Sequence, residues 1–154
     1  MEKELKVSAI KNGTVIDRIP SSSLFKVINI LGLDMCNNQI TFGMNLESKK
    51  LGNKAIIKVT DRYFENDDIN RIALVAPSAK LNTIKDYEVI DKRVVEVPKE
   101  IEGIVRCMNP KCITNHERIP TKFKVLQKNN DVVLLCRYCE KITEEKNFEI
   151  SNVK

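Results

Sequence analysis

The chain has 154 residues, 42% of them hydrophobic and 31% charged, which is ordinary for a globular protein of one medium or two small domains. No apolar run approaches the roughly 20 residues that span a bilayer, and the first residues lack the apolar core of a secretory signal. We therefore expect a cytoplasmic protein without a membrane partner.

The net charge of +5 is spread along the chain, with +2 on residues 1–96 and +3 on residues 97–154. Proteins that follow a phosphate backbone usually carry a clustered basic stripe. The charge distribution therefore does not favour a nucleic-acid partner, although it does not exclude one.

The first 95 residues alternate between the patterns typical of strands and of helices. In chain order they predict a strand, a helix, two strands, a second helix and two extended segments, over residues 5–9 continuing through 14–20, 23–32, 39–46, 54–60, 67–76, 80–84 and 86–97. Serines 21–23 and Asn66-Asp67 are the expected helix caps. This order predicts an α+β class and a ferredoxin-like βαββαβ domain over residues 1–97, with two helices on one face of a sheet.

Residues 97–103 read as a linker because they combine Pro98 with Gly103. Beyond it, residues 98–154 predict a small all-β domain of zinc-ribbon type, with a hairpin over 122–136 that turns at 129–131. A module of about 50 residues usually needs a metal or a disulfide to hold it together.

Four of the five cysteines lie in this second domain, in a C-x₄-C pair and a C-x₂-C pair formed by Cys107, Cys112, Cys136 and Cys139. Four thiolates at such spacing predict a closed tetrahedral zinc site, which is structural because no position is left for substrate. Two disulfides, a rubredoxin-like iron site and a redox-active pair are the alternatives. His116 could replace one cysteine, but a surface histidine is the simpler interpretation.

No catalytic residues are predicted. The chain has one histidine, five scattered glycines and none of the common nucleophile or phosphate-loop motifs. Cys36 is interpreted as an isolated, partly buried thiol. These observations favour a regulatory or binding subunit over an enzyme.

Two lysines interrupt predicted strands, Lys58 in the apolar run AIIKV and Lys92 after YEVID. On adjacent strands they could neutralise phosphate groups. Lysines that extend from strand edges into water are the other reading, which the pattern alone favours.

Three segments and the cysteine tail together resemble the regulatory chain family of aspartate carbamoyltransferase. They are VSAIKNGTVIDRIP, GMNLESKKLGNKAIIKV, LVAPSAKLNTIKDYEVIDK and the C-x₄-C…C-x₂-C-E-K pattern, and the resemblance runs collinearly from about Leu5 to Phe148. It implies a non-catalytic chain with an allosteric nucleotide-binding domain followed by a zinc domain. The implied effectors are CTP, UTP and ATP, with Mg²⁺ as an accompanying ion, and the implied structural metal is one Zn²⁺.

The resemblance also implies a nucleotide site. Its residues would be Val7, Ala9, Ile10, Val15, Asp17, Arg18, Ile56, Lys58, Asn82, Ile84, Tyr87, Val89 and Lys92. Backbone groups of Ala9, Ile10 and Tyr87 would read the base, Asp17 the ribose, and Lys58 with Lys92 the phosphates. Arg18 stands where well-known members have histidine.

The implied partner is the catalytic chain, which the zinc loop would contact through Asn109 and Lys111. Lys111 replaces an asparagine of the family. Regulatory homodimers would join catalytic trimers, three dimers to two trimers, and so control pyrimidine biosynthesis. The alternative function is a zinc-ribbon adaptor for nucleic acid, which the low aromatic content of 5% does not favour. An oxidoreductase that uses the C-x₂-C pair is a third possibility.

Overall fold

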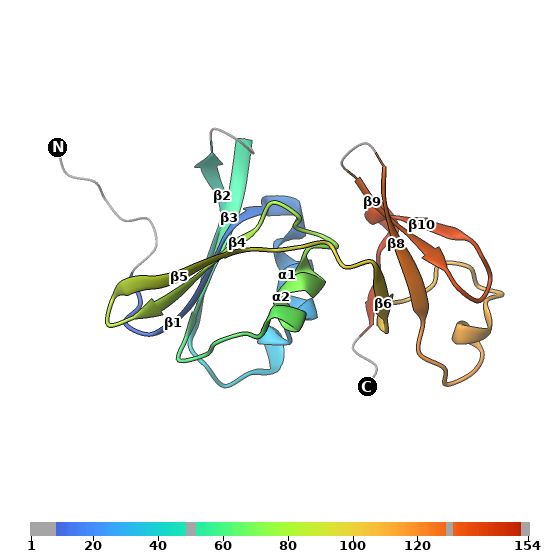
Figure 1. Ribbon diagram of the computed structural model, residues 1–154, viewed down its shortest axis with the longest axis horizontal. Coiled ribbons are helices and arrows are strands. Elements are labelled where there is room, and N and C mark those ends of the chain that lie inside the picture. Colours follow the sequence, from blue (N-terminus) through green and yellow to red (C-terminus); the bar gives the residue numbers. More distant parts are fainter. Residues whose placement is uncertain (1–8, 49–51, 129–130, 152–154) are drawn as a thin grey trace. The chain divides into compact units, whose positions relative to one another are not determined.

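The computed structural model describes residues 9–48, 52–128 and 131–151 (Figure 1). The chain divides into two compact units, residues 1–95 and residues 96–154, and each is described by itself. Within the described part of the chain, no helix is long and apolar enough to cross a membrane.

The first unit is built on a five-stranded antiparallel sheet with the strand order β2-β3-β1-β4-β5. Its strands are β1 (Gly13–Pro20), β2 (Ile40–Ser48), β3 (Gly52–Thr60), β4 (Lys80–Lys85) and β5 (Glu88–Val94). Two α-helices interrupt them, so β1 to β4 follow the βαββαβ order and β5 extends the sheet beside β4. The predicted α+β, ferredoxin-like class is confirmed.

Helices α1 (Leu24–Ile30) and α2 (Asn66–Ile72) lie on the same face of this sheet (Figure 1). Alternation along the strands supplies the apolar surface beneath them, because every second residue of β3 points to that face. The core therefore joins side chains from β1, β3 and both helices: Ile16, Leu24, Val27, Ala55, Ile57, Val59, Ile69 and Ile72. The opposite face is covered by no helix among the described residues.

Helix α2 is shorter than the apolar pattern predicts. It ends at Ile72, and the predicted continuation to Ala76 is a series of turns in which Ala76 N–H donates to Ile72 O at 2.8 Å. Ser23 is the N-cap residue of α1, as expected, but its side chain makes no cap hydrogen bond. The expected cap of α2 is wrong, since its N-cap residue is Glu65, which has no side-chain cap either. The Asn66 side chain instead accepts a hydrogen bond from Arg93 Nη1 at 2.8 Å.

Three strands of the first unit carry irregularities that alternation does not predict. The β1–β3 register shifts between Ile16 and Ile19, and Arg18 inside this bulge has a φ of 59°. The β2–β3 register shifts between Gly43 and Leu46, and the β4–β5 register between Thr83 and Ile84. A bulge adds one residue to a strand and so changes which side chains share a face.

Gly13 begins β1 because no other residue fits its position. Its φ is +139°, and a Cβ atom there would lie 2.0 Å from the carbonyl oxygen of Val59. The glycine therefore permits the close approach of β1 to β3 at this end of the sheet. On its other side, Gly13 pairs with Ile84 of β4.

The second unit contains a four-stranded sheet, β10-β9-β8-β6, and a two-stranded sheet, β11-β7. Their strands are β6 (Glu100–Glu102), β7 (Ile104–Val105), β8 (Lys122–Lys128), β9 (Asp131–Cys136), β10 (Ile142–Glu144) and β11 (Ile150–Ser151). The predicted small all-β unit is therefore confirmed. Strand β6 lies inside the segment predicted as a linker, so that prediction is wrong there. The predicted hairpin is formed by β8 and β9, and its turn includes residues 129–130, outside the described residues.

Candidate metal centre and candidate effector site

Two separate segments of the second unit bring the four cysteines together. Cys107 follows β7 and Cys112 precedes a short 3₁₀ helix (Ile113–Asn115), whereas Cys136 ends β9 and Cys139 lies in the turn after it. Cys107, Cys112 and Cys136 are buried and Cys139 is half-buried. Hydrogen bonds from Cys112 N–H to Asn109 O (3.0 Å) and from Glu140 N–H to Cys136 O (3.0 Å) close the two loops.

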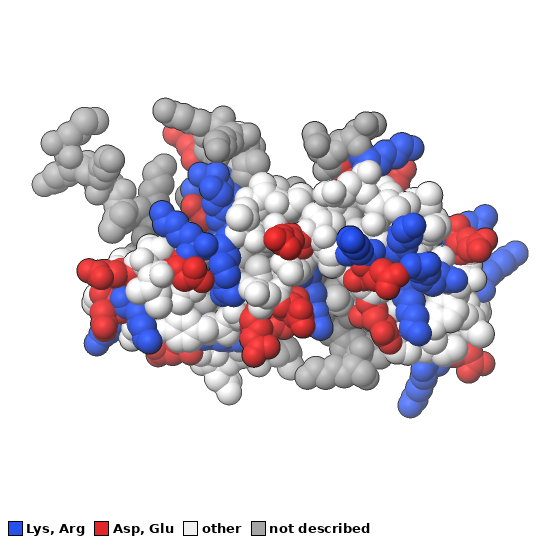
Figure 2. Space-filling model, in the orientation of Figure 1, with Lys and Arg blue, Asp and Glu red and all other residues white. Residues whose placement is uncertain are grey.

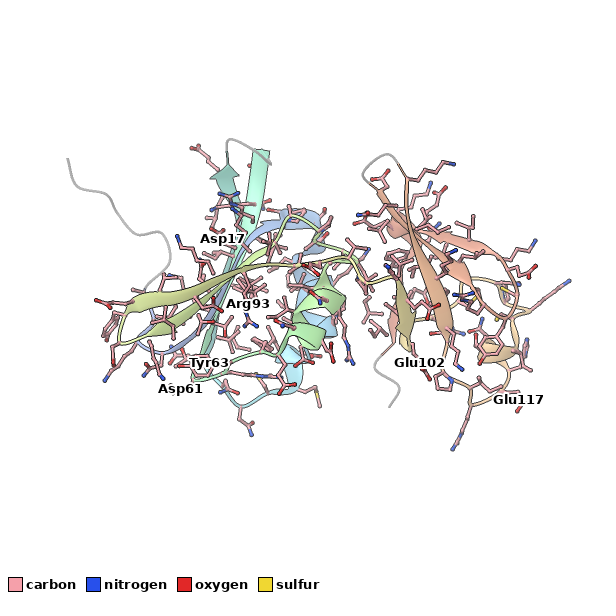
Figure 3. All side chains as sticks on the ribbon, in the orientation of Figure 1. Asp17, Asp61, Tyr63, Arg93, Glu102 and Glu117 are labelled. Atoms are coloured by element: carbon pink, nitrogen blue, oxygen red, sulfur yellow. The ribbon has the colours of Figure 1, made fainter. Side chains whose placement is uncertain are left out.

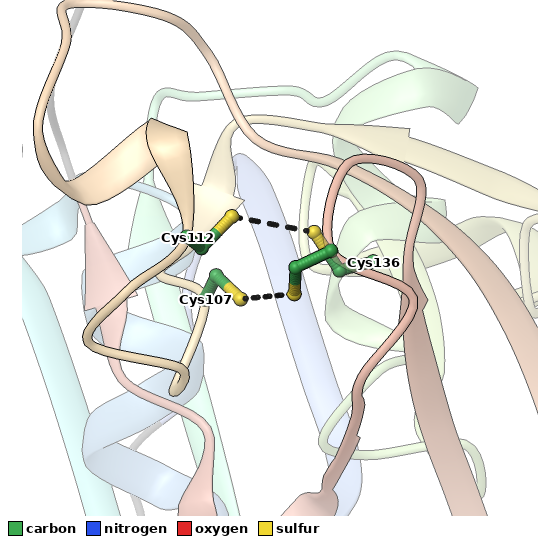
Figure 4. Close-up of side chains that lie close together, drawn as sticks. Cys107, Cys112 and Cys136 are labelled. Carbon is green, nitrogen blue, oxygen red and sulfur yellow. Dashed lines mark hydrogen bonds between the residues drawn. The ribbon is translucent and has the colours of Figure 1, made fainter.

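The four sulfur atoms lie within 4.8 Å of one another. Cys107 Sγ is 3.6 Å from Cys139 Sγ, and Cys112 Sγ is 3.7 Å from Cys136 Sγ (Figure 4). A tetrahedral Zn²⁺ with sulfurs at about 2.3 Å requires sulfur–sulfur separations of about 3.8 Å. Disulfide sulfurs would be about 2.05 Å apart, so the thiols are unpaired and the geometry fits zinc.

The environment of the thiols also fits a cation. Burial raises the pKa of Cys107 and that of Cys136. Burial acts in the same direction on Cys139, but hydrogen bonds from the Asn109 side chain and the Lys141 backbone amide lower the pKa of Cys139 to about 7. Four thiolates this close repel one another unless a positive ion lies between them, and a divalent metal removes that repulsion.

Asn109 and Lys111, the predicted contacts with a catalytic chain, lie in the loop between the first two cysteines. Lys111 is exposed, whereas Asn109 is half-buried and its Oδ1 accepts from Lys111 N–H at 3.1 Å. Asn109 thus organises the loop, and Lys111 is the residue of the two whose side chain is presented to solvent. His116 Nε2 hydrogen-bonds Pro110 O at 2.9 Å and is not among the clustered ligands.

In the first unit, one cross-strand row on the helix-free face contains four of the predicted nucleotide-site residues. Val15 on β1 pairs with Lys58 on β3 and with Asn82 on β4, and Asn82 pairs with Lys92 on β5. Directly opposite residues in antiparallel strands share a face and lie about 4.5–5.5 Å apart. The two lysines therefore lie at either end of a short row whose centre is Val15 and Asn82.

A second row lies two residues further along the sheet. Ile84 on β4 pairs with Gly13 on one side and with Val89 on the other. The bulge in β5 allows Val89 and Lys92, three positions apart, to share one face, although regular alternation would separate them. Val89 is exposed and Ile84 is buried.

An ion pair extends the polar surface along β1 and β3. Asp17 Oδ1 lies 2.9 Å from Lys54 Nζ, and Figure 3 labels Asp17 in this part of the sheet. Ile56 and Lys58 follow Lys54 at intervals of two and are half-buried with it. Burial lowers the pKa of Lys58, an effect that the nearby Asp17 carboxylate opposes. Lys54 is not among the residues predicted from the sequence, although its position four residues before Lys58 on the same strand places both side chains on one face.

The turn between β4 and β5 is attached to the segment that precedes β1. Asp86 and Tyr87 both have positive φ, 50° and 69°, as the two central residues of a type I′ turn do. Tyr87 N–H donates to Lys11 O at 2.9 Å, which brings Tyr87 beside the segment of Ala9 and Ile10. Tyr63 Oη donates to Ile84 O at 3.3 Å from the same end of the sheet (Figure 3).

Two predicted site residues belong to none of these groups. Arg18 lies inside the β1 bulge, where its N–H donates to Asp17 Oδ1 at 2.7 Å and its carbonyl accepts from Ser78 Oγ at 2.9 Å. Val7 lies outside the described residues.

Comparison with known proteins accounts for both units. Residues 5–96 match the family model of the aspartate carbamoyltransferase regulatory chain, allosteric domain, and residues 99–149 match that of the metal binding domain. The chain belongs to the aspartate carbamoyltransferase regulatory chain family.

Relatives match the chain over almost its whole length. The aspartate carbamoyltransferase regulatory chain of Bacteroides thetaiotaomicron is 54% identical over 150 residues, which cover 97% of this chain and 96% of the relative. The regulatory chain of Bacteroides fragilis is 53% identical with the same coverage, and that of Pyrococcus horikoshii is 52% identical over 147 residues, 94% of this chain and 96% of the relative.

Membership of the regulatory chain family confirms the prediction of a regulatory rather than a catalytic chain, since its members are named as the regulatory subunit. The first unit is an allosteric domain and the second a metal-binding domain, whose cysteine cluster fits structural zinc. Figure 2 shows Lys and Arg interspersed with Asp and Glu on the face in view, with no continuous basic stripe there.

Proposed function

We propose that this chain binds nucleoside triphosphates on the helix-free face of its first unit and uses them to regulate the catalytic chain of aspartate carbamoyltransferase. The effectors are CTP, UTP and ATP, accompanied by Mg²⁺. The observation that carries the proposal is the cross-strand row Lys58–Val15–Asn82–Lys92, because it combines two ammonium groups with an amide and an apolar floor. Triphosphates need cationic partners, and a base needs hydrogen bonds beside an apolar surface.

Each part of the nucleotide has a partner in the proposed site. Lys92, with Lys58 and Arg18, receives the phosphates, and Asp17 accepts hydrogen bonds from the ribose hydroxyls. Backbone groups of Ala9, Ile10 and Tyr87 read the base above Val15, Ile84 and Val89, with Val7 and Ile56 completing the apolar lining. Lys54 already pairs with Asp17 at 2.9 Å, so a ribose that engages Asp17 also reorganises this ion pair.

In the second unit, Cys107, Cys112, Cys136 and Cys139 hold one Zn²⁺, which keeps the two cysteine loops in place. The loop with Asn109 and Lys111 then contacts the catalytic chain. In the cytoplasm, regulatory dimers join catalytic trimers, three dimers to two trimers, and control pyrimidine biosynthesis. A nucleotide regulates this assembly only through unequal affinity for its two states.

Titration calorimetry of the chain with CTP and ATP, each with Mg²⁺, tests the nucleotide site. We expect binding in the millimolar range or tighter and about a tenfold loss of affinity for Lys92→Ala, as for one charge-assisted phosphate contact. Lys124→Ala is the matched control, because it removes an exposed strand lysine from the second unit. The proposed site would be refuted if neither nucleotide gave a binding heat, or if the parent chain, Lys92→Ala and Lys124→Ala bound nucleotide with equal affinity.

A further inference from the structure

The loop between Cys107 and Cys112 is held by two side chains that follow it in the sequence. Asn115 Nδ2 donates to Cys107 O at 3.0 Å and to Asn109 O at 2.7 Å. His116 Nε2 lies 2.9 Å from Pro110 O, and it must donate because a carbonyl oxygen only accepts. Three carbonyl groups of one short loop are thus bound by two consecutive residues.

A fourth contact fixes the orientation of the Asn115 amide. Arg106 Nε donates to Asn115 Oδ1 at 3.0 Å, so the amide oxygen faces Arg106 and the amide nitrogen faces the loop. Arg106 is itself anchored, since its N–H donates to Glu149 O at 2.9 Å. Asn115 is half-buried, and its hydrogen-bonding capacity is used on both sides of the amide.

These contacts turn the polar backbone of the loop inward and leave other side chains outside. Met108 is 40% exposed, Ile113 is 47% exposed, and Pro110 and Lys111 are exposed as well. Tyr138, from the second cysteine loop, is 41% exposed. Aromatic residues and Met are enriched at protein interfaces, so exposed Met108 and Tyr138 suit contact with a partner.

We propose that Asn115 is a positioning residue that holds residues 108–111 in the conformation recognised by the catalytic chain. This inference rests on the proposed function, in which that loop contacts the catalytic chain. The metal pins the two ends of the loop at Cys107 and Cys112, but it makes no bond to the four residues between them. Asn115 and His116 hold this middle part from outside the loop, in addition to the bonds that Asn109 makes within it, so partner binding depends on contacts that bind no metal.

If Asn115 positions the loop without supporting the metal, its variants should weaken partner binding and leave zinc binding unchanged. Asn115→Ala removes all the side-chain contacts. Asn115→Asp keeps the size and the contact with Arg106, but it loses both donors and sets a carboxylate oxygen against the carbonyl oxygens of Cys107 and Asn109. Gln127→Glu is the matched control, because it makes the same amide-to-carboxylate change on β8. Gln127 pairs with Val132, whereas Cys136 pairs with Phe123 at the other end of the hairpin.

The experiment measures, for the full chain and each variant, the zinc content and the affinity for the catalytic trimer of the same organism. Zinc is quantified by atomic absorption and affinity by sedimentation velocity. Hydrogen exchange at the backbone amides of Met108, Asn109 and Lys111 is followed in parallel. We expect unchanged zinc, faster exchange in the loop and an affinity lowered about tenfold or more for both Asn115 variants, which corresponds to the loss of two or so net hydrogen bonds. Gln127→Glu should behave like the parent chain.

Two results would overturn the inference while the proposed function stands. In one, the Asn115 variants keep their zinc and bind the trimer as tightly as the parent chain. In the other, they lose the metal, which would make Asn115 a support of the zinc site itself. If the parent chain with full zinc does not bind the trimer, the proposed function fails, and this inference fails with it.

Discussion

The two units of this chain are stabilised in different ways. The first buries apolar side chains from its sheet and both helices, with residues such as Ile16, Leu24, Ile57, Ile69 and Leu74 at most 2% exposed. Apart from cysteines, the buried hydrophobic residues described in the second unit are few: Ile101, Val105, Phe123, Val132, Leu134 and Phe148. We therefore expect the second unit to obtain from a metal the stability that the first obtains from its core.

This difference corresponds to the division of function that we propose. A sheet whose other face supplies the core can expose a polar, ligand-binding surface without losing stability. A small unit held by a metal can present its loops directly to a partner, because the metal holds the ends of each loop and side chains such as Asn115 hold the part between them.

Removal of one metal ligand should unfold the second unit. Cys136→Ser eliminates a buried thiolate, and zinc contributes about 10–16 kcal/mol to the folding of small zinc modules. We expect loss of zinc and collapse of the amide signals of residues 96–154 in NMR spectra, with those of residues 9–95 preserved. Cys36→Ser is the control, because Cys36 is half-buried and lies outside the cluster. A Cys136→Ser chain that keeps its second unit folded would contradict the role of the metal.

Truncation of a core side chain in the first unit should destabilise that unit and leave the second unit intact. Ile57 is fully buried on the helix-facing side of β3, and Ile→Ala in a core costs about 2–5 kcal/mol. Ile57→Ala should lower the melting temperature of the first unit and leave the zinc content unchanged. Ile56→Ala is the matched control from the other face, where the side chain is half-buried, and its cost should be clearly smaller. Equal costs would mean that the helix-free face is also part of the core.

Two consecutive residues of β5 should separate binding from stability. Lys92 lies on the helix-free face opposite Asn82, whereas Arg93 pairs with buried Leu81 and donates to Phe64 O at 3.0 Å and to Asn66 at 2.8 Å (Figure 3). Lys92→Ala should weaken CTP binding without lowering the melting temperature. Arg93→Ala should destabilise the first unit by about 1–2 kcal/mol, since it removes hydrogen bonds from a charged donor that is partly exposed.

The Arg93→Ala chain should still bind CTP while it is folded. Calorimetry and thermal unfolding of the two variants provide both readouts. The account would be wrong if Lys92→Ala destabilised the fold while its CTP affinity stayed normal.

The smallest predicted effect concerns alkaline pH. Burial places the pKa of Lys58 below its usual value of 10.5, and a bound phosphate would stabilise the ammonium form and raise that pKa. Nucleotide affinity should therefore be full below the pKa of Lys58 in the free chain and fall as the pH rises through it. Calorimetry between neutral pH and pH 10 would measure this decline. Lys58→Arg should remove it, because arginine stays protonated; an identical decline in that variant would assign it to another group.

Much of the first unit could be predicted because periodicity reports local structure directly. Alternation in residues 40–46 and the run AIIKV correspond to β2 and β3, and the helix predicted to stop at Gly32 corresponds to α1. The end of α2 could not be predicted. Residues 73–76 are all apolar and buried, and such a sequence is compatible both with a continued helix and with the turns that the structure has. The β-bulges could not be predicted from the alternation of residues either. The bulge in β5 is the reason that Val89 and Lys92 lie on the same face of the sheet.

In the second unit, the clustering of the four cysteines could be predicted from spacing and residue type alone. The contacts that organise the loop between them could not. The side chains of Asn115 and His116 hydrogen-bond backbone carbonyl groups. Every residue has a carbonyl group, so the sequence does not indicate which side chain will bind which carbonyl. The same limitation hid β6, whose pairing with β8 depends on a segment some 20 residues away.

The most direct test of the account is CTP titration of the chain before and after the metal is removed, with zinc content and association with the catalytic trimer measured on the same samples. Removal of zinc should abolish association, while the CTP affinity should stay within about twofold, because the proposed site lies entirely in the first unit. Loss of CTP binding together with the metal would contradict the account, since it would show that the effector site depends on the metal-stabilised unit.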